Sequence, residues 1–194
     1  MSKKTDTSGK GPIRYEDGLA AAKIVSRAAD EIKAKVAVCG GLALHIYGFT
    51  RSTKDVDLLG ERLLSFREIR KLNFGGVAYE VSIDGGTIEV DLIIRSDEIQ
   101  ELYQQALNDA KVVKSIGLRV VSPEYMVILK YLAGRGKDQI DLMWLLREDN
   151  LVDRKKVKAI VSKQMGKHSY WAIRDLDQLY LEADLLKARD GVSE

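Results

Sequence analysis

Two aspartates, Asp55 and Asp57, are separated by one residue in the segment 54–59, which otherwise has the apolar character of a buried strand. Alternate residues of a strand point to the same face, so both carboxylates project from one side of a sheet. Aspartate is disfavoured in strands, and two like charges on one face repel each other. The pair therefore indicates a sheet that holds a cation here, although an isolated Asp-X-Asp pair is more often the solvent-facing side of a half-exposed strand.

A glycine pair lies shortly before these aspartates. Gly40 and Gly41 separate a predicted buried strand, 36–39, from a short predicted helix, 42–47. Backbone N–H groups in such a turn are free to bind an anion, and the missing side chains let a triphosphate approach closely. An ordinary tight turn is the alternative interpretation of the pair.

A third acid, Asp91, interrupts the apolar segment 87–94. The preceding segment, 77–83, and an Asp-Gly-Gly turn predict that 87–94 is the second strand of a hairpin. If this strand lies beside the first, Asp91 completes a cage of three carboxylates with Asp55 and Asp57. Oxygen ligands favour Mg²⁺ or Mn²⁺, and the chain has only two histidines and one cysteine from which to build a zinc site.

Such a cage suits phosphoryl transfer. With two ions about 3.5–4 Å apart, one activates an attacking hydroxyl and the other stabilises the leaving pyrophosphate. We therefore predict Asp55, Asp57 and Asp91 as metal-binding and catalytic residues, with Asp91 helping to deprotonate the acceptor. Arg51 and Lys54 are placed to neutralise phosphate charge, although charged loop residues are more often simply solvated.

The order of predicted elements changes near residue 122. Before it, helices and strands alternate; after Ser122-Pro123, which is typical of a helix start, every segment is helical. The predicted fold class is α+β, a mixed-sheet core followed by a C-terminal helical region. We expect a disordered tail over 1–14, a catalytic core over 15–121 and a helical domain over 122–194. The remaining predicted elements are helices over 15–33, 61–72 and 97–109 and strands over 111–116 and 118–121.

Composition restricts the partners. The chain has 194 residues with 31 Lys and Arg against 29 Asp and Glu, so its net charge of +2 gives no overall field for nucleic acid. No apolar segment is long enough for a membrane span, and the first residues are polar, unlike a signal peptide. We expect a cytoplasmic protein without a membrane partner. The basic region 154–167 is more typical of a solvated helix face than of an RNA-binding surface.

The segments 38–44 and 51–57 and the strand with Asp91 together resemble the DNA polymerase beta-like nucleotidyltransferase superfamily. The pattern that begins Arg51-X-Thr53 and runs on to Asp-X-Asp is most similar to the AbiEii-type toxin nucleotidyltransferases. The resemblance implies a polymerase beta-like core that uses Mg²⁺ or Mn²⁺ to transfer NMP from a nucleoside triphosphate (NTP) to a hydroxyl acceptor. That acceptor would be an RNA or tRNA end, and an antitoxin protein would be the partner.

The same resemblance assigns the groups that hold the NTP. In the first half these are Gly40, Gly41, Arg51 and Thr53, and many members carry Ser where this chain has Gly41. In the second half, the segment 130–142 is similar to a Lys and Arg-X-Lys-Asp-X-X-Asp pattern of the group. It implies that Lys130 contacts the phosphates and that Asp138 assists catalysis. The alternative is that Asp138 and Asp141 only stabilise the first turn of a helix through its dipole.

Other functions stay open at this stage. A non-catalytic nucleotide- or partner-binding module would keep the same fold, and a metal-dependent nuclease or phosphohydrolase would use a similar acid triad. A small molecule such as an antibiotic is a further possible acceptor, because a fold does not fix its substrate. The glycine turn ahead of the aspartates favours a bound triphosphate and hence nucleotidyl transfer.

Overall fold

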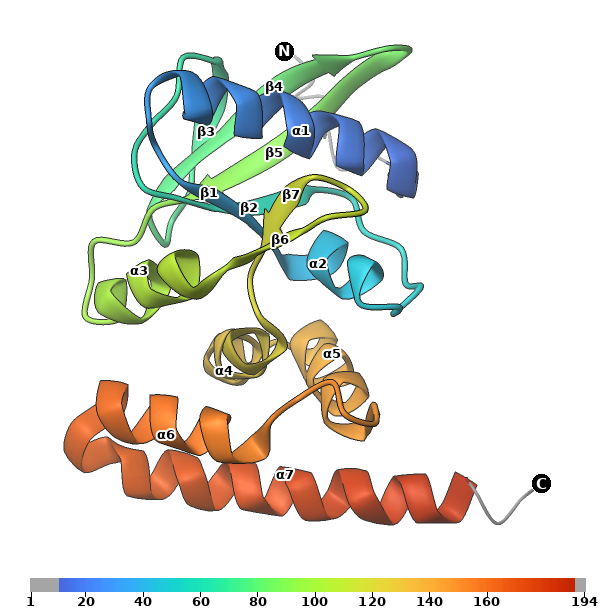
Figure 1. The fold of residues 1–194 in the computed structure, drawn as a ribbon, viewed down its shortest axis with the longest axis vertical. Coiled ribbons are helices and arrows are strands. Elements are labelled where there is room, and N and C mark those ends of the chain that lie inside the picture. Colours follow the sequence, from blue (N-terminus) through green and yellow to red (C-terminus); the bar gives the residue numbers. More distant parts are fainter. Residues whose placement is uncertain (1–10, 191–194) are drawn as a thin grey trace, which may run out of the picture. The chain divides into compact units, whose positions relative to one another are not determined.

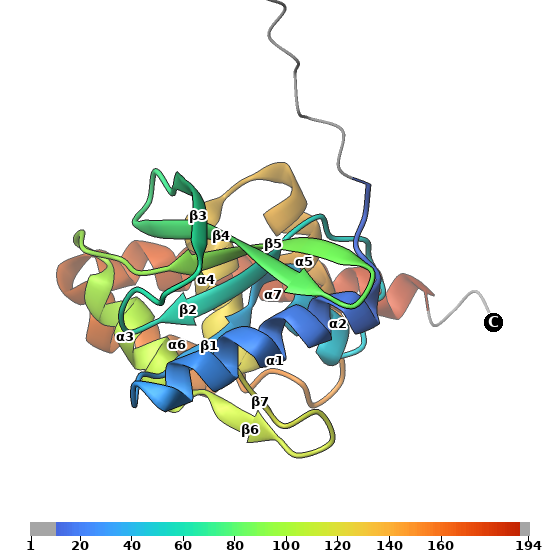
Figure 2. The ribbon, with the colours of Figure 1, turned by 90° about the horizontal axis from the view of Figure 1, so that it is seen from above.

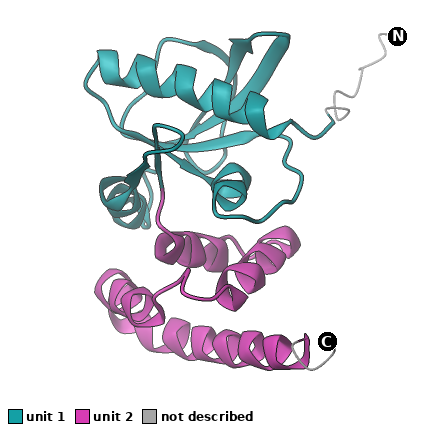
Figure 3. Ribbon diagram, turned by 45° about the vertical axis from the view of Figure 1, so that its right-hand side comes forward, with its two compact units in different colours: residues 1–120 teal, residues 121–194 magenta. Residues whose placement is uncertain are grey.

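The computed structural model describes residues 11–190 and divides into two compact units, residues 1–120 and 121–194 (Figure 3). The compositional change at residue 122 lies next to this division. Most of the predicted tail, 1–10, lies outside the described residues. Ile13, which was also assigned to the tail, donates a backbone hydrogen bond of 2.8 Å to the carbonyl of Thr53, so it belongs to the first unit.

Over residues 11–120, the first unit contains three helices and a sheet of seven strands. In chain order its elements are α1 (Tyr15–Glu31), β1 (Val36–Cys39), α2 (Gly40–Ile46), β2 (Val56–Gly60), β3 (Arg67–Lys71), β4 (Gly76–Ile83), β5 (Gly86–Ile93), α3 (Gln100–Asp109), β6 (Lys111–Val113) and β7 (Leu118–Val120).

The strands lie in the order β3-β4-β5-β2-β1-β7-β6 (Figure 1). β2 runs parallel to β5 and β1 parallel to β7, while the other neighbours are antiparallel, so the sheet is mixed. Helix α1 covers one face of the sheet, as the view from above shows (Figure 2), and α2 and α3 lie on the other face. The predicted α+β class with a mixed sheet is confirmed.

The core of the first unit lies between α1 and the sheet. Small residues of α1, among them Ala21, Ala22 and Ala29, are fully buried. They meet apolar strand residues that point to the same side, such as Val56 and Val90, which are also fully buried. The period of about 3.6 residues in the helix and of two in the strands brings these residues to one layer, as expected from the sequence. The opposite side of the strands carries Asp57 and Asp91 beside buried apolar residues such as Leu59.

The prediction of a helix over 61–72 is wrong, because residues 67–71 form the edge strand β3, paired antiparallel with β4. All five residues of β3 are exposed, and charged residues of this kind favour helices in isolation. Pairing with β4 outweighs that preference, and charged side chains protect an exposed sheet edge from pairing with other chains. The register shifts between Glu68 and Arg70, which marks a β-bulge.

The strand predicted over 54–59 begins two residues later, at Val56. The hydroxyl of Thr53 donates a hydrogen bond of 3.0 Å to the carbonyl of Asp55, which holds Asp55 in a turn before the strand. The hairpin predicted from 77–83 and 87–94 is present as β4 and β5.

The second unit is helical throughout the part that the structure describes, with α4 (Pro123–Ala133), α5 (Gly136–Arg147), α6 (Arg154–Met165), the short 3₁₀ helix η1 (Gly166–His168) and α7 (Ser169–Asp190). Pro123 occupies the first turn of α4, and Gly134 ends that helix with a φ of +62°. Asp153 caps α6 by accepting hydrogen bonds from two backbone N–H groups. Within residues 11–190, no helix has the length and apolar character to cross a membrane.

Candidate active site

One row of residues runs across five neighbouring strands of the first unit. The row follows the registers of β3, β4, β5, β2 and β1 and consists of Arg70, Ala78, Asp91, Asp57 and Cys39. Residues paired across neighbouring strands point to the same face of a sheet. Asp57 and Asp91 are therefore direct neighbours with their side chains on one face, which meets the condition set for the cage in the sequence analysis.

Asp91 is 5% exposed and is held by Arg70. The Nη2 group of Arg70 donates to both oxygens of Asp91, at 3.1 and 3.3 Å, and to Oε1 of Glu89 at 2.6 Å. Burial raises the pKa of Asp91 above its ordinary value; the guanidinium opposes that shift, and the charges of Asp55 and Glu89 add to it. Asp55 is thus near enough for its charge to act on Asp91.

Gly40, the first residue of α2, lies directly against Asp57. Its φ is +61°, and a β-carbon built there would lie 1.9 Å from Oδ2 of Asp57. Only glycine fits this position, because any other residue would both collide with the carboxylate and adopt a disfavoured backbone conformation. The glycine turn and the aspartate pair, 17 positions apart in the chain, thus form one packed unit.

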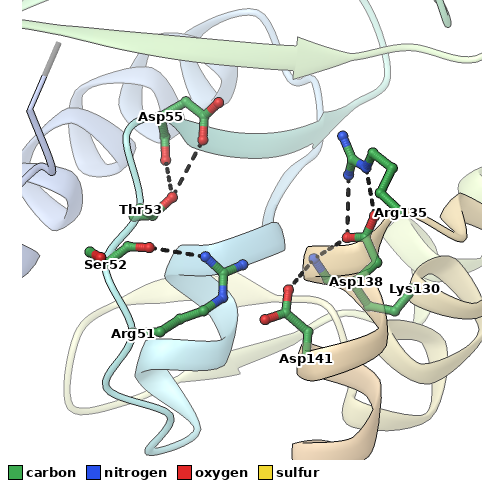
Figure 4. A network of polar contacts seen from close by, with 8 residues as sticks. All are labelled: Arg51, Ser52, Thr53, Asp55, Lys130, Arg135, Asp138 and Asp141. Atoms are coloured by element: carbon green, nitrogen blue, oxygen red, sulfur yellow. Dashed lines mark hydrogen bonds and ion pairs between the residues drawn. The ribbon is translucent and has the colours of Figure 1, made fainter. Parts of the chain in front are cut away.

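Gly41, Arg51 and Thr53 lie together beside Asp55. A β-carbon at position 41 would lie 2.8 Å from Oγ1 of Thr53 and 3.4 Å from Nη2 of Arg51. The Thr53 hydroxyl also lies 3.3 Å from Oδ1 of Asp55, and Arg51 donates to the carbonyl of Ser52 at 3.0 Å (Figure 4). Thr53 therefore fills the space that a serine at position 41 would need, which accounts for glycine at this position.

Sequence reasoning missed two side chains of this site. Arg70 lies on the strand that was predicted as a helix, so nothing in the local pattern indicated its contact with Asp91. Tyr103 of α3 was predicted only as part of a helix. Burial raises the pKa of Tyr103 to about 12, and the charges of Cys39 and Asp57 add to the shift, which shows that the phenol lies near the row.

In the second unit, Lys130 is held in a buried cluster of charges (Figure 4). Its Nζ lies 2.9 Å from Asp138 and 2.7 Å from Asp141, both of which have no exposed surface. Arg135 adds an ion pair of 2.5 Å to Asp138. Burial alone would raise the pKa of Asp138, but the hydrogen bonds from Arg135 and Lys130 outweigh it and hold the pKa below its ordinary value. This geometry joins α4 to α5, and the phosphate contact of Lys130 and the catalytic role of Asp138 stay predictions.

The predicted cage of three carboxylates is not assembled in the structure. Among residues 11–190, no group of three or more His, Cys, Asp and Glu side chains has an arrangement that could hold a metal ion. In the structure, both oxygens of Asp91 accept hydrogen bonds from Arg70. The donor chemistry still fits a hard cation, since Asp57 and Asp91 are adjacent carboxylates and a positively charged guanidinium already contacts Asp91. The ligand roles of the three aspartates stay predictions.

Comparison with solved structures identifies the fold. An antigenic nucleotidyltransferase-like protein from Paracoccidioides brasiliensis is 16% identical over 88% of this chain and 94% of that protein, with a TM-score of 0.51. A protein from H. pylori that is assigned as a nucleotidyltransferase is 14% identical over 93% and 96%, with a TM-score of 0.50. The chain has a nucleotidyltransferase-like fold. The antibiotic-resistance factor ANT(2'')-Ia is also similar, at 14% identity over 85% and 98%, with a TM-score of 0.49.

No family of known proteins matches the chain, and no curated protein is similar to it in sequence. The row with Asp57 and Asp91 is therefore defined by the sheet registers of this structure and not by a sequence match to a known protein.

Proposed function

We propose that this protein is a metal-dependent nucleotidyltransferase that transfers a nucleoside monophosphate from an NTP to a hydroxyl acceptor. The observation that carries the proposal is the alignment of Asp57 with Asp91 on one face of the sheet, against Gly40. Neighbouring carboxylates on adjacent strands are costly unless a cation lies between them. The nucleotidyltransferase-like fold supports the same reaction class.

In the proposed reaction, the acceptor oxygen forms a bond to the α-phosphorus of the NTP. The bond from that phosphorus to the oxygen bridging to the β-phosphate breaks, and pyrophosphate leaves with the bonding electrons. Bound Mg²⁺ or Mn²⁺ would neutralise the charge that develops on the phosphate oxygens. Asp55 and Asp57 would hold the ions, and Asp91 would also take the acceptor proton. Its raised pKa supports that role, because a base works best with a pKa near the working pH.

The groups near Asp55 are assigned to the triphosphate. Arg51 lies beside Gly41, where its guanidinium would meet phosphate oxygens bound against the start of α2. Thr53 fixes the turn that carries Asp55, through hydrogen bonds to its carbonyl and its carboxylate. Both residues thus lie at the part of the site formed by Gly41 and Asp55.

Lys130 and Asp138 of the second unit each have a functional and a structural interpretation. The resemblance assigns Lys130 to the phosphates and Asp138 to the active site. The buried ion pairs favour a role in joining α4 to α5, because Lys130 already has two carboxylate partners. A Lys130→Arg variant that folds as the wild type but has a raised KM for NTP would support the phosphate role.

The narrower assignment is an AbiEii-type toxin that modifies an RNA or tRNA end and is opposed by an antitoxin protein. It rests on the pattern from Arg51 to Asp57. An antibiotic or another small molecule is the competing acceptor. Supplying each acceptor class separately decides between them, since a given enzyme labels only the class that it recognises.

The experiment uses each NTP labelled on its α-phosphate, with Mg²⁺ and a panel of acceptors that includes bulk tRNA, total protein and an aminoglycoside. Incorporation of label is expected from the wild type and not from Asp57→Asn. Asp84→Asn is the matched control, because it makes the same change at an exposed turn of the first unit. Shortening of the RNA in place of labelling would instead identify a nuclease.

A non-catalytic nucleotide-binding module is the second candidate. The ion pair between Arg70 and Asp91 favours it, because this pair engages a carboxylate that catalysis needs. NTP binding without incorporation on any acceptor, unchanged by Asp57→Asn, would favour that module over the enzyme.

A further inference from the structure

The β-bulge in β3 decides which face of the sheet Arg70 occupies. In a regular strand, residues 68 and 70 would share a face. Here Glu68 pairs with Tyr79 while Arg70 pairs with Ala78, so the two side chains point to opposite faces. Bulges commonly re-aim a side chain beside a functional site. The shift places the positive residue on the face of Asp57 and Asp91 and the negative residue on the other face.

Ala78 opens the path between Arg70 and Asp91. It stands between them in the row, on the strand that separates β3 from β5. Its methyl group leaves room for the long arginine side chain to cross and reach both oxygens of Asp91. A larger residue at this position would block the crossing.

The partners of Arg70 differ in how firmly they hold it. The contact with Glu89, at 2.6 Å, is shorter than the contacts of 3.1 and 3.3 Å with Asp91. The Arg70 side chain is 47% exposed, whereas that of Asp91 is 8% exposed. The exposed guanidinium can therefore leave Asp91 and keep its contact with Glu89, whereas the buried Asp91 side chain stays in place.

We propose that Arg70 is a positioning residue that takes the place of a metal ion at Asp91, and that a divalent cation binds the row by displacing the guanidinium onto Glu89. The inference rests on the proposed function, since it concerns the same carboxylates. Without the ion, the arginine balances the charge of a nearly buried aspartate and keeps it aligned with Asp57. Metal binding then replaces the guanidinium at Asp91 with a metal ion, so the buried carboxylate is never left without a positive partner.

The first test measures Mn²⁺ binding from the loss of the free-ion signal in electron paramagnetic resonance. Arg70→Gln removes the competitor, and we expect its Kd for Mn²⁺ to fall by about fivefold, which is the size expected for a partly exposed ion pair. Arg67→Gln is the matched control. Arg67 lies on the same strand and face, but its ion pair of 2.6 Å is with Glu80. It reports the effect of losing one positive charge near the site.

The second test follows the wild type and uses a variant only to assign one resonance. Mg²⁺ titration is followed through the side-chain Nε–H resonance of Arg70, assigned by its absence from Arg70→Lys. We expect this resonance to shift as the ion binds, because the guanidinium leaves Asp91 and a divalent cation takes its place. An unchanged Arg70 resonance at saturating Mg²⁺ overturns the displacement.

The outcomes separate this inference from the proposed function. If Asp57→Asn abolishes Mn²⁺ binding but Arg70→Gln binds no more tightly than Arg67→Gln, the role of Arg70 is wrong and the metal site stands. If no form binds Mn²⁺ in a manner that depends on Asp57, both proposals fall. Tighter binding by Arg70→Gln together with the resonance shift supports both.

Discussion

Gly40 and Asp57 are in direct van der Waals contact across the junction of β1 and α2, with no room between them for a β-carbon. The Asp57 side chain therefore packs against the main chain of Gly40 and not against a mobile side chain. Since Asp57 in turn pairs with Asp91, the position of the glycine fixes one of the two paired carboxylates.

Replacing Gly40 with alanine is expected to reduce nucleotidyl transfer by about 100-fold, because a displacement of about 1 Å at reacting groups has an effect of that size. The unfolding free energy should fall by about 1–2 kcal/mol from the positive φ alone. Gly117→Ala is the control: its φ is +71°, but nothing lies within 4 Å of the added carbon. Equal losses of activity in the two variants would contradict a specific role for the Gly40 contact.

Gly41 has no positive φ, so the collision with Thr53 is the main obstacle to a side chain there. We expect Gly41→Ala to lower the unfolding free energy by about 1–3 kcal/mol through overpacking. In a Thr53→Ala background the hydroxyl is gone, and about 1 kcal/mol of that loss should be recovered. Urea unfolding of the four proteins of this double-mutant cycle measures the coupling, and strictly additive losses would refute the contact.

Tyr79 ties the loop before β3 to the sheet. Its buried hydroxyl accepts a hydrogen bond of 2.8 Å from the N–H of Leu64 and donates one of 2.9 Å to the carbonyl of the same residue. Tyr79→Phe leaves both backbone groups without this partner, and we expect a loss of about 2–3 kcal/mol in unfolding free energy. Tyr170→Phe, at a residue 66% exposed, should change stability little. A loss equal to that of the control would show that water replaces the hydroxyl.

The ion pairs of Asp138 predict a dependence of stability on pH. Because its pKa is lowered in the folded protein, this carboxylate contributes stability above the ordinary aspartate pKa of about 4, and the contribution is lost as pH falls through the folded-state pKa. Asp138→Asn should therefore be less stable than wild type by about 3 kcal/mol near neutral pH. The difference should shrink in acid. Urea unfolding across the pH range measures it, and a gap that widens in acid would contradict the assigned pKa direction.

Local patterns were sufficient for most of the first unit. Apolar segments around Asp57 and Asp91 predicted their strands, and the turn at residues 84–86 predicted that β4 and β5 form a hairpin. These features depend on neighbouring residues in the chain, where side-chain period and turn chemistry act directly. Local patterns did not predict that β2 pairs with β5, and this pairing makes the two aspartates neighbours on one face.

Features that depend on pairing between distant segments could not be predicted from local patterns. Arg67–Lys71 consists of residues that favour a helix, and only the edge of β4 makes it a strand. Arg70 enters the site through this pairing and through a bulge, neither of which leaves a local signal. The three-carboxylate cage was predicted from the spacing of Asp55 and Asp57 and from Asp91 in a neighbouring strand, and none of these patterns indicated an arginine at Asp91.

The registers that align Asp57 with Asp91 are maintained from the far side of the sheet. Val56 and Leu58 alternate with Asp57, as Val90 and Leu92 do with Asp91, and all four are buried. A slip of one residue between β2 and β5 would push a carboxylate into the apolar layer beneath α1. The apolar layer thus keeps the two carboxylates aligned, and core substitutions that loosen it would slow the proposed nucleotidyl transfer without changing any polar group.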